Sequence, residues 1–110
     1  MEFIDEYFSQ ATAGYLDESW AMCSPAYQVK YKSFDVFSNF WTSVTSSSVV
    51  ELLWSSSLGP DGVEVDLFVQ FDGRNGLRYD ERVLVDVIRD GQGGLVINDY
   101  LVLSSDNHPI

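Results

Sequence analysis

Three polar side chains with useful chemistry fall at strand positions that the sequence pattern turns toward the core: Tyr79, Glu81 and Asp99. Aligning the apolar faces of neighbouring strands puts Leu67 opposite Glu81 and Val85 opposite Asp99. A carboxylate on an apolar face has a raised pKa and can act as a general base. Asp99 is therefore a candidate base, Tyr79 a candidate for orienting a substrate, and Glu81 a further candidate acid.

The same positions also have a structural interpretation, which we favour. Glu81 can lie at an open rim or be turned outward by a bulge, and Asp99 can hydrogen-bond a helix end or a tyrosine. The two carboxylates differ by about four residues of register, which is roughly 13 Å at about 3.3 Å per residue. They cannot form one catalytic dyad, so we assign no catalytic residue firmly.

The remaining reactive residues argue against metal and nucleophile chemistry. His108 is the only histidine and lies near the C-terminus, which leaves a nucleophile–histidine arrangement or a histidine metal site without a source. Cys23 is the only cysteine and shares an apolar helical stripe with Leu16 and Trp20, the position of a buried structural thiol. We expect no metal and no cofactor.

The amino-acid composition limits the classes of partner that the chain is expected to bind. The chain carries 17 acidic against 6 basic residues, a net charge of −11, which argues against binding to nucleic acid or an anionic membrane. It contains no apolar run near the roughly 20 residues of a membrane helix, so we expect no membrane insertion of this chain. Its 110 residues make one domain. The compartment stays open.

The hydrophobic period divides the chain into a helical half and a strand half. Apolar residues recur every three or four positions up to about residue 44, and then alternate, as in Val63, Val65, Leu67 and Val69. The expected helices are 2–13, 15–23 and 33–44, and the expected strands are 47–57, 62–72, 77–90 and 94–104. Short glycine-rich links between the strands predict an antiparallel meander. The fold class is α+β, with one domain over 1–104 and a frayed tail over 105–110.

Three segments resemble the small bacterial members of the NTF2-like superfamily. Residues 15–25 resemble their "D-x-A-W-x-L-x-S-P" helix, residues 34–41 their next helix, and residues 94–100 their final "G-W-x-I" strand, with Leu95 in place of the tryptophan. The resemblance implies a cone in which three N-terminal helices pack on a curved four-stranded antiparallel sheet. It also implies a pocket, and a possible place as an extracytoplasmic domain of a membrane-anchored parent.

Two surfaces follow from this arrangement. A ligand pocket under the helices would be lined by Trp20, Phe37, Trp41, Tyr79 and Asp99, although aromatic residues at helical spacing are more often core. The outer sheet face would carry an apolar interface made of Phe68, Leu84, Ile88, Val96, Tyr100 and Val102. We expect that face to form a homodimer or to dock onto another protein domain.

The sequence thus favours a non-catalytic domain that binds a partner protein or a small apolar ligand. The alternative is a small isomerase, dehydratase or cyclase in which Asp99 is the general base and Tyr79 orients the substrate. The fold by itself does not decide between them.

Overall fold

The computed structural model describes residues 2–110, and the segment from residue 2 to residue 42 is helical. The helices in it are α1 (Glu2–Ala13), α2 (Leu16–Ala21), α3 (Pro25–Tyr31) and α4 (Phe34–Thr42). Gly14 ends α1 with φ at 92°, a left-handed conformation that glycine adopts without strain. Ser33 begins α4, because its side chain accepts a hydrogen bond from the Val36 backbone N–H.

The structure has four helices where the sequence predicted three, and the additional helix is α3. Ser24 and Pro25 were expected to end a helix, but Ser24 is the N-cap of α3 and Pro25 is its first residue. The Ser24 hydroxyl accepts a hydrogen bond of 3.1 Å from the Tyr27 backbone N–H. Proline suits this position because the first turn of a helix needs no N–H donor there. The same dipeptide therefore starts a helix rather than stopping one.

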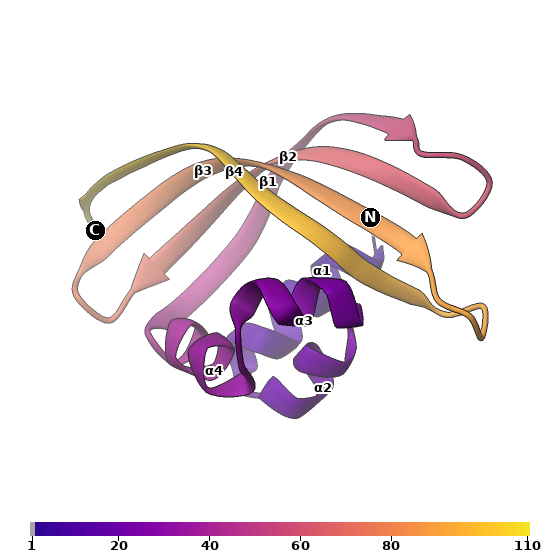
Figure 1. The fold of residues 1–110 in the computed structure, drawn as a ribbon. Helices are drawn as coiled ribbons and strands as arrows, with labels where there is room; N and C mark the ends of the chain where they lie inside the picture. Colours follow the sequence, from indigo (N-terminus) through magenta and orange to yellow (C-terminus); the bar gives the residue numbers. More distant parts are fainter. Residues whose placement is uncertain (1) are drawn as a thin grey trace.

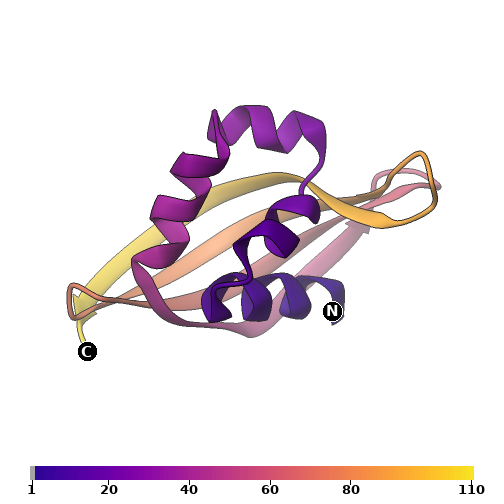
Figure 2. The same ribbon diagram turned by 90° about the horizontal axis from the view of Figure 1, so that it is seen from below.

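The strand half forms one open antiparallel sheet in the order β1-β2-β3-β4, as the alternating pattern predicted. Its strands are β1 (Val44–Ser57), β2 (Gly62–Gly73), β3 (Leu77–Arg89) and β4 (Leu95–Pro109). The helices lie together on one face of the sheet, which curves over them (Figure 1). Seen from the helix side, they cross the middle of the strands and leave the hairpin ends uncovered (Figure 2). The α+β class is confirmed.

The strand β4 runs further than the sequence predicted. Residues 105–110 were expected to be a frayed tail, but Ser105 pairs with Glu81, Asn107 with Tyr79 and Pro109 with Leu77. The start of β3 offers an unpaired edge to these residues, and backbone pairing there outweighs the polar side chains that suggested a tail.

The pairing of β2 with β3 differs from the predicted register by two residues. Leu67 lies opposite Val83, and Val69 lies opposite Glu81. A shift of two leaves each side chain on its predicted face, because strand side chains alternate with a period of two. On the outer face Asp66 contacts Arg82 diagonally, with two hydrogen bonds of 3.0 and 2.6 Å from the guanidinium to the carboxylate.

A bulge at Asn98 in β4 changes which residues face the helices. Val87 lies opposite Ile97, but Asp86 lies opposite Asp99, so Asn98 is an extra residue. The Ile97 backbone bonds the connection between α2 and α3, and the Ser24 hydroxyl donates to Asn98 Oδ1 at 2.8 Å. These contacts hold the bulge in place. Beyond it Val85 lies opposite Tyr100, not Asp99, and Tyr100 faces the helices.

The core lies between the helices and the concave side of the sheet. Its sheet side is a block of aliphatic residues that are at most 1% exposed: Val65, Leu67, Val69, Val83, Val85, Val87 and Ile97. Its helix side is mainly aromatic, with Tyr7, Phe8, Phe37 and Trp41 in the same buried cluster. Burying this apolar surface is the main source of the domain's stability.

Candidate ligand pocket

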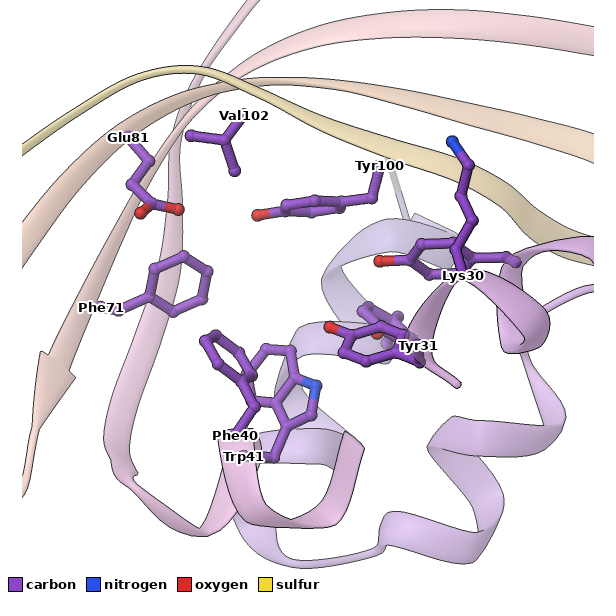
Figure 3. A pocket seen from close by; sticks show the side chains of 10 residues that line it. Lys30, Tyr31, Phe40, Trp41, Phe71, Glu81, Tyr100 and Val102 are labelled. Carbon is purple, nitrogen blue, oxygen red and sulfur yellow. The ribbon is translucent and has the colours of Figure 1, made fainter. Parts of the chain in front are cut away.

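A cavity of about 310 Å³ lies where the helices and the concave sheet face separate (Figure 3). It is lined by Tyr7, Tyr27, Lys30, Tyr31, Phe40, Trp41, Phe71, Glu81, Tyr100 and Val102. The lining is aromatic with few polar groups, as in most small-molecule sites. Phe40 and Val102 are 43% and 45% exposed and lie at its mouth.

The pocket is built by every layer of the fold. On α3, Tyr27 and Tyr31 are four residues apart and so share a helix face. Trp41 comes from the end of α4, where its ring packs against Phe71 of β2 with ring centres 5.8 Å apart. Tyr100 enters the pocket only because of the bulge at Asn98.

Two buried polar atoms in the lining make no hydrogen bond of normal geometry among residues 2–110: the Tyr100 hydroxyl and Trp41 Nε1, although Trp41 lies near enough to the Tyr7 hydroxyl to act on its pKa. The hydroxyls of Tyr100 and Tyr31 point into the cavity (Figure 3). Burial, with a smaller effect from the charge of Glu81, raises the pKa of Tyr100 well above its usual value, so the phenol stays protonated. It can both donate and accept a hydrogen bond.

Glu81 is the one carboxylate in the lining of this cavity. Its Oε2 accepts a 2.9 Å hydrogen bond from the Ser105 hydroxyl, which the extended β4 supplies. Lys30 is the corresponding cation, but its ammonium is turned toward β4 and bonds Asp99 Oδ1 at 2.5 Å (Figure 3).

A second cavity of about 490 Å³ adjoins the first and shares Phe40, Phe71 and Glu81 with it. Tyr79 lies here, and its hydroxyl accepts a 2.8 Å hydrogen bond from Asn75 Nδ2. Glu81 therefore borders both cavities.

The structure separates the residues that the sequence grouped into a pocket. Trp41 lines the first cavity and Tyr79 lines the second, but Phe37 is fully buried core and Trp20 packs against it with ring centres 5.0 Å apart. Asp99 is displaced by the bulge to the outer face and pairs with Lys30, so its predicted place inside the pocket is wrong. The pocket predicted from the sequence did not include Tyr27, Tyr31 or Tyr100, and Tyr100 was placed in the outer interface instead.

On the outer face Asp99 belongs to a row of three acidic residues, Glu64, Asp86 and Asp99, on adjacent strands; we call it the acidic row. Burial and then the neighbouring Glu64 raise the pKa of Asp86 to about 6, with further contributions from Asp99 and, in the opposite direction, Lys30. Protonation of Asp86 relieves the repulsion.

The predicted outer interface does not form one surface. Phe68, Leu84 and Ile88 are half-buried on the outer face, and Val96 is only 8% exposed. Tyr100 and Val102 line the cavity on the opposite face, because the bulge turns this part of β4 over. The exposed apolar residues of the sheet lie instead on its two edge strands: Val50, Leu52, Leu53 and Trp54 on β1, and Leu95, Leu101, Val102 and Leu103 on β4.

Other candidate chemical groups lie apart from the cavity. Cys23 is 3% exposed, and burial raises the pKa of its thiol to about 12. His108 Nδ1 lies 3.6 Å from an Asp80 carboxylate oxygen at the end of β4. Within residues 2–110 no group of three or more histidine, cysteine, aspartate or glutamate residues is arranged so that it could hold a metal ion. In the same range, no helix has the length and apolar character to cross a membrane.

Comparison with known proteins identifies a fold relative but no family. No protein-family model matches the chain, and a search of curated proteins also gives no match. The fold is similar to the solution structure of a SEC-C motif containing protein from Rhodopseudomonas palustris, at 12% identity and a TM-score of 0.69. The match covers 93% of this chain and 77% of that chain. Similarity at this identity concerns the fold alone.

This comparison corrects the resemblance to the NTF2-like superfamily. The matching structure is a SEC-C motif protein, which belongs to a different fold family, and no family model supports the predicted membership. The segments that suggested it consist of helix caps and packing residues, such as Trp20 and Pro25, and many α+β domains need such residues at similar spacing.

Proposed function

We propose that this domain binds a small, largely apolar molecule in the aromatic pocket and catalyses no reaction on it. The observation that carries the proposal is the pair of buried polar atoms, the Tyr100 hydroxyl and Trp41 Nε1, that make no hydrogen bond of normal geometry within residues 2–110. Buried polar groups in native proteins are nearly always hydrogen-bonded, and leaving one unpaired costs about 1–3 kcal/mol. A ligand in the cavity would satisfy both.

A binding role also fits the chemistry of the lining better than the alternative enzyme. The phenols of Tyr31 and Tyr100 have raised pKa values, chiefly through burial, and are therefore poor bases at neutral pH. Asp99, the base in the alternative, is on the opposite face of the sheet and bonds Lys30. We therefore assign the pocket to ligand recognition rather than to catalysis.

The test is a fragment screen monitored by thermal shift and by the NMR spectrum of the labelled protein, first on the unmodified chain. Trp41→Phe keeps an aromatic ring but removes the N–H donor, so we expect weaker binding of the hits. Trp54→Phe is the matched control, because Trp54 is 42% exposed on β1 and outside the pocket. Absence of any saturable ligand, or equal weakening by both variants, would refute the proposal.

A second candidate function is self-association through the edge of β1. This strand bonds β2 on one side only, and Val50, Leu53 and Trp54 on it are 55%, 40% and 42% exposed. Glu51 is the single charged residue in β1, whereas the whole chain carries a charge of −11 that repels a second copy elsewhere. Antiparallel pairing of two β1 strands would give a closed two-fold dimer.

The oligomeric state decides this second candidate. We expect light scattering after size-exclusion chromatography to show a concentration-dependent dimer, and Leu53→Lys to shift it to monomer because the added charge would meet its own copy across the two-fold axis. Val29→Lys on α3 is the control, since Val29 is 75% exposed and far along the chain from β1. A wild-type chain that stays monomeric at all concentrations rules the dimer out.

A further inference from the structure

We infer that the ligand of the pocket is a small organic cation, a protonated primary or secondary amine carried on an apolar body with one hydrogen-bond acceptor. This inference rests on the proposed binding function and assigns its ligand class. It comes from the charge, the rings and the unpaired atoms of the same cavity.

The charge balance of the pocket is negative. Glu81 supplies the carboxylate, and its hydrogen bond from the Ser105 hydroxyl uses Oε2 and leaves Oε1 available. The only cation in the lining, Lys30, is bonded to Asp99 on the sheet. The field of Glu81 reaches the cavity, since it contributes to the raised pKa of both Tyr31 and Tyr100 after burial. A carboxylate ligand would be repelled, whereas an ammonium would complete an ion pair.

The aromatic rings of the cavity also favour a positively charged ligand. Trp41, Phe71 and Tyr100 line the cavity beside Glu81 (Figure 3). Aromatic faces attract cations, more strongly where water is excluded, and cages of such rings recognise organic ammonium groups. The rings would also bury the apolar body of the ligand.

The unpaired atoms specify the rest of the ligand. The Tyr100 hydroxyl can accept a hydrogen bond from an ammonium N–H that also bonds Glu81. Trp41 Nε1 can only donate, so it requires an acceptor on the neutral part of the ligand. A neutral ligand could at most donate a hydrogen bond to Glu81 without balancing its charge, and a quaternary ammonium would have no N–H to donate to the Tyr100 hydroxyl.

A series of three probes with one phenol body tests the inference: tyramine, tyrosol and para-hydroxyphenylacetate, which end in an ammonium, a hydroxyl and a carboxylate. Binding is measured by NMR titration of the labelled chain. We expect tyramine to bind at least about tenfold more tightly than tyrosol, and the carboxylate to bind most weakly. Glu81→Gln should bring tyramine and tyrosol to similar affinity. Asp80→Asn, which removes the same charge from the next residue on the outer face, should preserve the difference.

The outcomes distinguish a failure of the amine inference from a failure of the proposed binding function. Equal binding of tyramine and tyrosol, or tighter binding of the carboxylate, overturns the amine inference and leaves the binding function standing. If all three probes fail and the fragment screen gives only neutral or acidic hits, the inference is also overturned. If the screen gives no hits, both fail. Should Glu81→Gln not fold, salt titration of the unmodified chain decides, because added salt weakens tyramine binding selectively only if an ion pair forms.

Discussion

Replacement of Tyr100 by phenylalanine tests the central feature of the pocket, a buried hydroxyl without a partner. We expect Tyr100→Phe to stabilise the ligand-free domain, which is the opposite of what most core substitutions do. The ring keeps its packing against Phe8, where the ring centres are 6.4 Å apart, and only the hydroxyl is lost. The same change should weaken binding of a tyramine-like ligand, because a hydrogen-bonding group is removed.

The expected size follows from the state of that atom. A buried polar group without a partner costs about 1–3 kcal/mol. We take the lower end of this range, a gain of about 1 kcal/mol in the free energy of unfolding. For a domain of this size such a gain raises the melting temperature by about 4–8 °C.

The assay is urea unfolding followed by circular dichroism, with Tyr79→Phe as the matched control. The Tyr79 hydroxyl accepts a hydrogen bond from Asn75, so its removal should stabilise nothing and should cost up to about 1 kcal/mol. Opposite signs for the two tyrosines are the expected result. A Tyr100→Phe variant that loses stability as Tyr79→Phe does would show that the hydroxyl has a partner in the free protein, and the binding argument would lose its basis.

Three further predictions concern the frame around the pocket. The folded state raises the pKa of Asp86 to about 6 from an ordinary 3.8, so the folded chain holds this proton more tightly than the unfolded chain does. The contribution of Asp86 to stability is therefore complete below about pH 4 and is lost as the pH rises through 6. Urea titrations at several pH values should show this loss as a difference between the unmodified chain and Asp86→Asn. Ser24→Ala removes both a helix cap and the bond to the bulge, so unfolding should become easier by about 1–2 kcal/mol, more than for Ser33→Ala, which removes a cap alone. Cys23 should resist iodoacetamide in the folded chain at neutral pH and react on unfolding, because its pKa is about 12 and its side chain is buried; rapid labelling of the folded chain would contradict this.

The sequence predicted the elements of the fold better than the details that place the site. Alternating valines in β2 and β3 and the glycine-rich links were sufficient for the meander, because these signals are local. The missed helix α3 has only seven residues, and its first residue, Pro25, also occurs after helix ends. The end of β4 was missed because pairing with β3 is a long-range contact that polar residues 105–109 do not announce.

The site was less predictable because it depends on one-residue shifts. The bulge at Asn98 is fixed by contacts with the connection between α2 and α3, some 75 residues earlier in the chain, including the 2.8 Å bond from Ser24. No local pattern in β4 reports these contacts. The tyrosines of α3 carry a readable signal, the spacing of Tyr27 and Tyr31, but only once that segment is identified as a helix.

The bulge at Asn98 makes the polarity of the pocket depend on how one residue of β4 is accommodated. If Asn98 paired regularly with Asp86, Asp99 would lie opposite Val85 and face the helices, and Tyr100 would face outward. Deleting Asn98 would instead leave Asp99 opposite Asp86 and Tyr100 opposite Val85, because the bulge already absorbs that one residue. The bulge, which the hydrogen bond from Ser24 to Asn98 supports, therefore decides whether a neutral phenol or a carboxylate lies on the concave side of the sheet.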